Sequence, residues 1–348
     1  MKSRLLNVRQ KSTKREKFLF SKKSFYPSRK SRHRGPLKIF VSQKAGACGG
    51  VQQAVIRAEM EKAPVLGQVV HNERLVARLE ERGIPMLDRN ESIESLRARG
   101  ISRVTITAHG DPIKRFEELK AAGIEIIDTT CPIIEKGVYQ NIARYEGEGY
   151  QVILIGNPQH PEVIGAVSRG KTVKVIYNET DIDHLSLDPN KPILVLCQTT
   201  ITETMFLEIS GLVRKKFDNV ICLDTRCKPV AQTQQGILDL APLVDLMLIM
   251  GGQKSSNTAK LAQLAERFTR TIQINGPDNI QYDWFEDVDR LGIGAGTSTA
   301  TTDIDLLIDH LDQMIPLKLW RDVEVDPYKD RLPRPSDRFL GIVGERPK

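Results

Sequence analysis

Residues 126–140 read IIDTTCPIIEKGVYQ, in which an apolar run and two threonines lead into Cys131 and Pro132. A cysteine at such a junction allows three interpretations. It can be a small buried hydrophobe at the end of a strand, a nucleophile, or one ligand of a site whose other ligands lie far away in the chain. The organisation of the surrounding sequence decides which interpretation is favoured.

From Leu37 onward, short apolar runs typical of strands alternate with amphipathic stretches typical of helices. RVTITAHG (103–110) is followed by DPIKRFEELKAAG (111–123), and YQVILIGN (150–157) by HPEVIGAVSRG (160–170). Strands that alternate with helices of about 10–15 residues predict parallel sheets flanked by helices, and therefore an α/β fold. Polar and small residues gather where a strand ends and a helix begins, which is the edge where open parallel sheets bind ligands.

Three cysteines mark an internal repeat. Cys48, Cys131 and Cys227 each have Gly or Pro within two residues, which places each at a turn, and they lie 83 and 96 residues apart. Each is followed by a polar cluster 23 to 29 residues later and by a second one 61 to 71 residues later. The clusters contain His71 and His109 after the first cysteine, His160 and Thr199 after the second, and Ser255 and Ser298 after the third. This period predicts three α/β units with small parallel sheets, which direct three cysteines and six polar clusters toward one centre.

The repeat divides the body of the chain into three units. We assign residues 37–131, which contain Cys48, to the first unit and residues 132–222, with Cys131 at their start, to the second. The third unit covers residues 223–318, with Cys227 at its start. Residues 319–348 are rich in Pro, Arg and Asp and lack periodicity, so we expect an extended C-terminal tail there.

Residues 1–36 account for the positive charge of the whole chain. They contain 13 Lys or Arg and one acid, a net +12, whereas the rest has 38 basic and 43 acidic residues, a net −5, which together give +7. We expect this basic, Ser-rich tail to be disordered in a cytoplasmic protein, the alternative being a transit sequence that directs the protein to a plastid. The acidic body argues against nucleic acid as a partner, and the apolar runs are too short to span a membrane.

The cysteine pattern favours an iron–sulfur site over other uses of thiols. Five cysteines without a CxxC pair argue against a disulfide framework and against a structural zinc site. Cys197 and Cys222 lie inside apolar runs, where a thiol behaves as a small buried hydrophobe. An iron–sulfur cluster accepts cysteines that are distant in sequence, and a four-iron cluster with three protein ligands keeps one iron open for substrate.

Eight short motifs give the sequence a resemblance to a known family. They are GACGGV, VVHN, AHG, TTCP, HPEVIG, CQTT, SSN and GAGTST, and they occur in this order between residues 38 and 315. In this order and spacing the chain resembles the 4-hydroxy-3-methylbut-2-enyl diphosphate reductases of the LytB type. These are oxidoreductases that catalyse the last step of the methylerythritol phosphate route to isoprenoids.

The resemblance implies a [4Fe-4S] cluster at the centre of the three units, with Cys48, Cys131 and Cys227 as its ligands. It further implies that two electrons and protons remove the substrate hydroxyl as water, leaving isopentenyl and dimethylallyl diphosphates. Ferredoxin or flavodoxin is the implied electron donor. Glu162 would deliver protons, while Thr199 and His160 hold the hydroxyl end. The residues implied to grip the diphosphate are His71, His109, Ser255, Ser256, Asn257 and Ser298.

Simpler roles are open for some of these residues. Ser255 and Ser256 precede a helical stretch and suit an N-cap, which uses the same geometry as anion binding. Glu162 also suits an ordinary acidic position in the first turn of a helix. No Arg or Lys occurs in the motif clusters, so an anion there would be held by neutral donors and histidines.

The sequence also departs from the usual family pattern. The family has an aromatic residue at Ala47 and a histidine at Asn157, and a proline in place of Ala300. The largest set follows the third cysteine, where the family usually has Thr at the third following position and an Arg-Gln pair at the sixth and seventh. Here those positions hold Val230, Thr233 and Gln234. These departures leave two alternatives open: a divergent paralogue that reduces another hydroxylated anion, or a non-catalytic iron–sulfur sensor.

Overall fold

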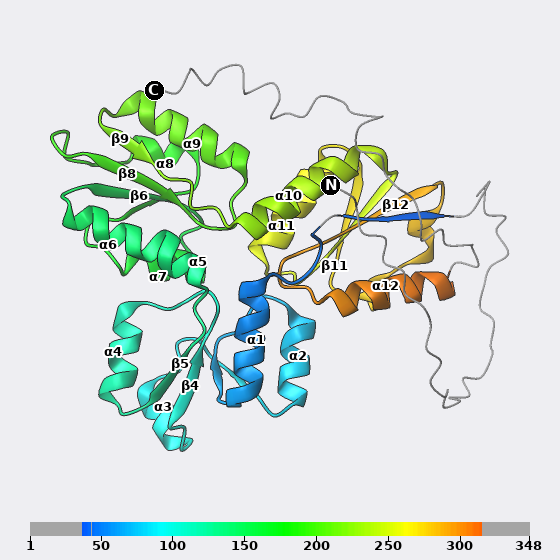
Figure 1. Cartoon of the computed structure of the whole chain (residues 1–348), viewed down its shortest axis with the longest axis horizontal. Helices are drawn as coiled ribbons and strands as arrows, with labels where there is room; N and C mark the ends of the chain where they lie inside the picture. Colours follow the sequence, from blue (N-terminus) through cyan, green and yellow to red (C-terminus); the bar gives the residue numbers. More distant parts are fainter. Residues whose placement is uncertain (1–36, 43, 315–348) are drawn as a thin grey trace.

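A computed structural model describes residues 37–42 and 44–314 of the chain. The predicted tails, residues 1–36 and 319–348, lie outside the described residues. Figure 1 shows three lobes that meet at the centre of the molecule, and each lobe contains one four-stranded parallel sheet with helices against it. This confirms the predicted α/β fold of three units.

The first lobe is built on strands in the order β3-β2-β4-β5. All neighbouring strands are parallel, as the alternation of strands and helices predicts. Its strands are β2 (Val65–Leu66), β3 (Met86–Leu87), β4 (Arg103–Ile106) and β5 (Glu125–Asp128). Its helices are α1 (Gly49–Glu61), α2 (Glu73–Glu81), α3 (Ile93–Ala98) and α4 (Ile113–Ala121).

The second lobe repeats this order as β7-β6-β8-β9. Its strands are β6 (Gln151–Ile155), β7 (Lys174–Ile176), β8 (Ile193–Cys197) and β9 (Val220–Cys222). Its first helix starts as α5 (Pro132–Ile134), widens into a π-helical turn at η1 (Glu135–Tyr139) and continues as α6 (Gln140–Gly147). The other helices are α7 (Pro161–Val167), α8 (Glu179–Asp183) and α9 (Glu203–Lys216).

The third lobe has the order β11-β10-β12-β1, so its fourth strand comes from the beginning of the body. Its strands are β1 (Lys38–Val41), β10 (Leu246–Met250), β11 (Arg270–Ile274) and β12 (Arg290–Ala295). Its longer helices are α10 (Lys228–Leu240), α11 (Ser256–Glu266) and α12 (Thr301–Met314). The 3₁₀ turns are η2 (Ala241–Leu243), η3 (Pro277–Asn279) and η4 (Tyr282–Phe285).

The placement of β1 corrects one predicted boundary. We assigned the residues from Leu37 to the first unit, but β1 pairs with β12, with Lys38 opposite Arg290. The physical reason is that the third unit supplies only three strands of its own within the described residues. Strand β1 completes that sheet, and the chain then enters the first unit at Cys48.

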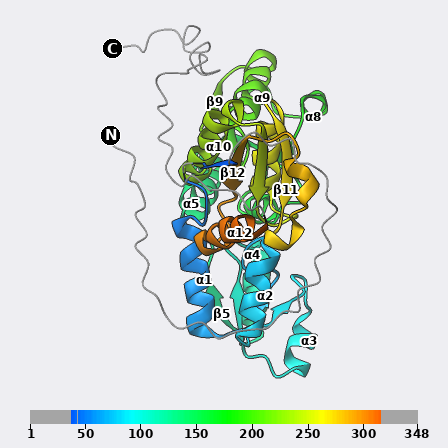
Figure 2. The same cartoon turned by 90° about the vertical axis from the view of Figure 1, so that its right-hand side faces the viewer.

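Burial explains why the central strands carry uninterrupted apolar runs. Every residue of β6, β8 and β10 is buried, because helices cover both faces of a parallel sheet. The edge strand β9 is shorter and partly exposed. Figure 2 shows the molecule along its thinner dimension, with the helices α1 and α2 in the first lobe. Among the described residues, no helix has both the length and the apolar character to cross a membrane.

A buried carboxylate joins the first and third lobes. Asp303, in the first turn of α12, is only 2% exposed, and its Oδ2 accepts a hydrogen bond from Arg78 Nη2 of α2 at 2.7 Å. The Nε of Arg74, on the same helix, lies 3.9 Å from Oδ1 of this carboxylate. Since a buried charge is costly without its partner, this pair helps to fix the two lobes relative to one another.

We expect Asp303→Ala to lower the free energy of unfolding by about 2 kcal/mol, below the full value for a buried pair because Arg78 is partly exposed. Arg144→Ala is the control, because it removes an exposed ion pair with Glu148 at 2.9 Å and should lower the free energy of unfolding much less. Urea titrations of both variants provide the comparison. Equal losses at the two positions would contradict a stabilising role for the contact between lobes.

Candidate functional site

The three repeat cysteines occupy equivalent places in the fold. Cys48, Cys131 and Cys227 are the N-cap residues of α1, α5 and α10, each directly after the fourth strand of a sheet or the short loop that follows it. The backbone N–H of each cysteine donates a hydrogen bond to a carbonyl beyond the third strand of that sheet. The acceptors are Thr297 at 3.0 Å, Ala108 at 3.0 Å and Thr199 at 2.9 Å, respectively. Equivalent hydrogen bonds thus hold all three cysteines at the centre.

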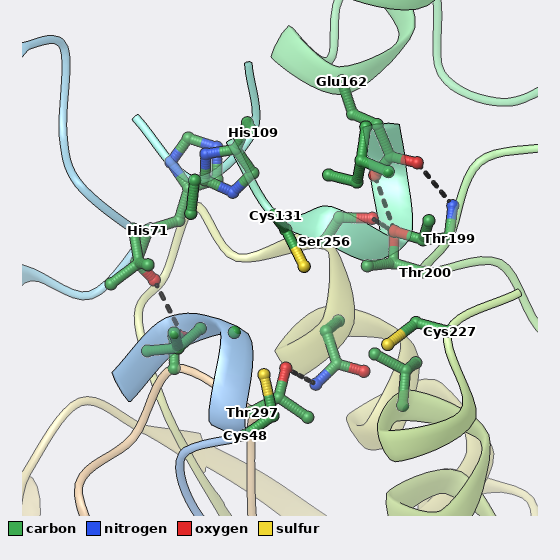
Figure 3. Close-up of a pocket in the computed structure, with 18 of the residues that line it drawn as sticks. Cys48, His71, His109, Cys131, Glu162, Thr199, Thr200, Cys227, Ser256 and Thr297 are labelled. Atoms are coloured by element: carbon green, nitrogen blue, oxygen red, sulfur yellow. Dashed lines mark hydrogen bonds between the residues drawn. The ribbon is translucent and has the colours of Figure 1, made fainter. Parts of the chain in front are cut away.

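The cysteines and polar clusters line one cavity of about 90 Å³ where the three lobes meet. Figure 3 shows the sulfur atoms of Cys48, Cys131 and Cys227 directed into the space between them. All twelve residues singled out from the sequence lie on this cavity wall: Cys48, His71, His109, Cys131, His160, Glu162, Thr199, Cys227, Ser255, Ser256, Asn257 and Ser298. Sequence reasoning missed the wall residues Thr200 and Thr297 and the apolar side chains Val51, Val70, Ile133 and Ile134.

The thiol side of the cavity suits a group that binds thiolates. Burial raises the pKa of the Cys131 thiol and raises that of Cys227 to about 11, and the neighbouring cysteines add to both effects. Backbone N–H groups of Ile133 and Ile134 oppose this at Cys131 by donating hydrogen bonds to its sulfur. A Cβ at Gly50 would lie 2.8 Å from Cys131 Sγ, so glycine there leaves room beside the sulfur. Three converging thiols are the donor set of an iron–sulfur cluster.

Of the two remaining cysteines, Cys197 is buried as predicted, whereas Cys222 is only partly buried. Cys197 is fully buried in the core of the second lobe, where burial raises its thiol pKa to about 12. Cys222 lies in β9 and packs against the same core while remaining partly accessible. Neither residue lines the cavity within the part of the chain that the structure describes.

Three histidines form a second wall of the cavity. The rings of His71 and His109 stack with centroids 4.3 Å apart, and His160 meets both rings edge-on at 5.7 and 5.4 Å. Burial lowers the pKa of each histidine, to about 3 for His160 and well below the usual value for His109. The three imidazoles are therefore neutral near pH 7 and can each present a hydrogen-bond donor. The Nδ1 atom of His71 is buried without a hydrogen-bond partner in the described structure.

Glu162 and Thr199 form a buried, hydrogen-bonded pair in the cavity wall. Glu162 is 1% exposed, and its carboxyl group accepts hydrogen bonds from Thr199 Oγ1 at 2.8 Å and from the Thr199 backbone N–H at 2.6 Å. Burial raises the pKa of Glu162 to about 7, although the hydrogen bonds from Thr199 act in the opposite direction. Glu162 lies in the first turn of α7, where its N–H donates to Nδ1 of the N-cap residue His160 at 3.2 Å. A carboxyl group with this pKa can give and accept protons near neutral pH.

The third lobe presents the N-terminus of α11 to the cavity. Ser255 is the N-cap of this helix and accepts a hydrogen bond from the Thr258 N–H at 3.2 Å, which fulfils the capping alternative. Ser256 instead lies 3.2 Å from the hydroxyl of Thr200 in the second lobe. The side-chain amide of Asn257 donates to Thr297 Oγ1 at 3.3 Å. Hydroxyls and free N–H groups at a helix N-terminus suit an anionic ligand.

Close contacts lock the His71 loop against the third lobe. Asn72 caps α2 and donates from Nδ2 to the Ser298 carbonyl at 2.9 Å, while Ser298 Oγ lies 3.5 Å from the His71 carbonyl. A Cβ at Gly252 would fall 2.2 Å from that same carbonyl, so only glycine permits this approach. The position of His71 in the cavity therefore depends on the third lobe as well as on its own.

Positive charge lies behind the cavity rather than in its wall. The described lining residues include no Arg or Lys, which agrees with the pattern of the motifs. However, Arg89 acts electrostatically on His71, His109 and His160, and it is held by hydrogen bonds to the Asp111 carboxylate at 2.8 and 3.1 Å. Sequence reasoning missed Arg89, because the stretch LDRN (87–90) lies outside the repeated clusters.

The unusual residues of α10 have partners in this structure. Thr233 Oγ1 lies 2.9 Å from the Pro229 carbonyl and 3.3 Å from that of Lys44, and Gln234 Nε2 lies 3.4 Å from the Ile201 carbonyl. Gln234 therefore joins the third lobe to the second, whereas the contacts of Thr233 lie within the third lobe, because Lys44 follows β1. Val230 alone of these three lines the cavity, where it places methyl groups.

Comparison with known proteins agrees with the geometry. The sequence profile described as LytB protein matches residues 39–312. The chain belongs to the LytB family. Membership in this family implies an iron–sulfur cofactor, and the LytB relatives of known name include the 4-hydroxy-3-methylbut-2-enyl diphosphate reductase of Pseudothermotoga lettingae. That protein is 32% identical over 282 residues, which cover 79% of this chain and 98% of the relative.

Further LytB relatives extend the comparison. The reductase of the same name from Aquifex aeolicus is 34% identical over 270 residues, covering 75% of this chain and 91% of the relative. A solved structure of (E)-4-hydroxy-3-methyl-but-2-enyl diphosphate reductase is 31% identical, with a TM-score of 0.58 over 80% of this chain and 99% of that chain. The Plasmodium falciparum E-1-hydroxy-2-methyl-but-2-enyl-4-diphosphate reductase is 22% identical with a TM-score of 0.74, over 88% and 98% of the two chains, and supports the fold.

The hydrogen bond between Thr199 and Glu162 predicts a measurable pKa change. Thr199→Val removes the Oγ1 donor, which favours the ionised carboxylate, so the pKa of Glu162 should rise further, by about one pH unit. This titration is followed by the infrared absorption band of the Glu162 carboxyl group. The band is identified by its absence in Glu162→Gln. Thr200→Val is the matched control, because its hydroxyl contacts Ser256 rather than Glu162. A band that titrates alike in both variants would contradict the assigned hydrogen bond.

Proposed function

We propose that this LytB-family chain reduces 4-hydroxy-3-methylbut-2-enyl diphosphate to isopentenyl and dimethylallyl diphosphates, the last step of the methylerythritol phosphate route. The observation that carries this proposal is the meeting of three thiols, three neutral histidines and a buried carboxyl group around one cavity. In the overall reaction the substrate C–O bond breaks, one proton joins the leaving hydroxyl to form water, and two electrons and a second proton form a new C–H bond in the product. A substrate of this kind requires both an anion site and a proton donor beside a redox centre.

Cys48, Cys131 and Cys227 would hold a [4Fe-4S] cluster. Their sulfurs face one space, and N–H groups of the helices that follow donate to the sulfurs of Cys131 and Cys227, which favours thiolates there. When bound, such a cluster supplies electrons and a Lewis-acidic iron for cleavage of an allylic C–O bond. We infer ferredoxin or flavodoxin as the source of the electrons.

The cavity wall opposite the thiols would bind the diphosphate. His71 and His109 donate from neutral imidazoles, and Ser255, Ser256, Asn257 and Ser298 surround the N-terminus of α11. Neutral donors together with the field of Arg89 attract an anion without a lysine or arginine in direct contact. This arrangement favours the binding of a diphosphate over the binding of an uncharged alcohol.

Glu162 would deliver a proton to the leaving hydroxyl, with Thr199 and His160 holding that end of the substrate. Its pKa of about 7 keeps a large fraction of the carboxyl protonated at neutral pH. Thr199 donates to the Glu162 carboxyl group, and His160 Nδ1 accepts from the Glu162 backbone N–H, so both residues would hold the substrate hydroxyl close to the proton donor. Exclusion of water follows from the burial of all three side chains.

The side chain of Val230 supports a second candidate function, that of a divergent paralogue that reduces another hydroxylated anion. It presents methyl groups at a cavity position where the family usually has a hydroxyl, which alters the polar contacts available to a substrate. Turnover of the reconstituted protein with dithionite-reduced viologen and 4-hydroxy-3-methylbut-2-enyl diphosphate decides between the candidates. Formation of both five-carbon diphosphates supports the reductase, whereas a brown protein without turnover of this substrate supports the paralogue or a sensor.

The ligand assignment predicts a loss of colour. Cys131→Ser should abolish the visible absorption of the reconstituted protein together with its activity, because it removes one of three thiolates. Cys197→Ala is the matched control from the same lobe, and it should retain colour and turnover. Full absorption in Cys131→Ser, or its loss in Cys197→Ala, would mean that other cysteines bind the cluster.

The proton-donor assignment predicts a variant that keeps its cluster but turns over slowly. Glu162→Gln should lower kcat by about 10²-fold or more, the usual effect of losing a general acid, while the visible spectrum stays unchanged. Viologen oxidation measures the rate and absorption spectroscopy the cluster. A rate equal to that of the unaltered protein would exclude Glu162 from the reaction.

A further inference from the structure

Lys260 is a buried, positively charged residue that is not part of the cavity wall. It lies on α11, one turn beyond Asn257, and is 6% exposed. Its Nζ has no hydrogen-bond partner in the described structure, and the side chain does not line the cavity. Burial of an unpaired ammonium group is costly, so an electrostatic partner is required to account for it.

The groups that face Lys260 all belong to the second lobe. Its Nζ lies 5.8 Å from the ring centroid of Tyr177, and its charge acts on Glu162, His160 and the Cys197 thiol. The side chain therefore reaches across the contact between the third and second lobes. Because Lys260 is not among the residues that line the cavity, its side chain approaches the Glu162 region from outside the cavity.

Glu162 has several other neighbours, which differ in charge from Lys260. Thr199 is a neutral hydrogen-bond donor, and the thiols of Cys131 and Cys227 and the hydroxyl of Tyr139 are destabilised as anions by the Glu162 carboxylate. His160 is neutral, since burial lowers its pKa to about 3. Lys260 is the one cation that acts on Glu162 among the described residues.

We propose that Lys260 is a positioning residue that holds a positive charge behind Glu162 and stabilises the carboxylate formed when Glu162 gives up its proton. In that step the carboxyl O–H bond breaks, the proton joins the leaving oxygen of the substrate, and the bonding electron pair stays on the carboxylate. The inference rests on the proposed role of Glu162. Although burial lowers the pKa of Lys260 to about 8, the ammonium form still predominates at pH 7.

Replacement of the charge tests the inference. Lys260→Met removes the ammonium group but keeps an unbranched side chain, and it should lower kcat about 10-fold with little change in KM, because the substrate does not contact Lys260. The pKa of Glu162 should rise without the cation, so the alkaline limb of the kcat–pH profile should move up by about one pH unit. Lys260→Arg keeps the charge and should restore both the rate and the profile.

A double-mutant cycle separates this inference from the role of Glu162. In the Glu162→Gln background, Lys260→Met should change kcat by less than about twofold, because the group it acts through is absent. An equal loss in both backgrounds, or an unchanged pH profile in Lys260→Met, would overturn the inference. A fast Glu162→Gln enzyme would overturn the proton-donor role itself. Visible spectra and unfolding midpoints of each variant identify losses of cluster or fold.

Discussion

The site depends on three backbone hydrogen bonds, from the N–H groups of Cys48, Cys131 and Cys227 to carbonyls at the ends of β12, β4 and β8. Each bond joins the start of one lobe to the carboxyl edge of the preceding sheet. Because the three lobes share one strand order, the same bond recurs around the centre. A cysteine held at an N-cap by such a bond directs its side chain away from its own helix and toward the shared space.

This arrangement gives the cavity two chemically different walls. One wall carries thiols, and the other carries neutral donors from two lobes and the N-terminus of α11. Burial keeps the histidines uncharged and raises the pKa of Glu162 to about 7. The cations Arg89 and Lys260 act from outside the wall, so an anion can be attracted without a rigid ion pair in the cavity.

The sequence predicted much of this arrangement because its signals were local. Apolar runs such as QVILI and LMLIM are fully buried strands, and the polar clusters that follow the first and third strands of each lobe do meet in space. The boundary at Leu37 was wrong because the partner of β1 is about 250 residues away in the chain, and no local pattern specifies a pairing over that distance. Arg89 and Lys260 were missed for a related reason, since neither occurs in a motif and their charges act across packed elements.

The sequence by itself determined the α/β class, the threefold repeat and the chemical identity of the residues at the centre. Periodicity and residue type are properties of short segments, and they suffice for those conclusions. Only the tertiary structure decided that β1 closes the third sheet, that Asn72 and Gly252 fix His71 against another lobe, and that Lys260 is buried without a hydrogen-bond partner among the described residues. Burial and long-range contacts set these features, because desolvation and electrostatic fields arise only when distant segments pack together.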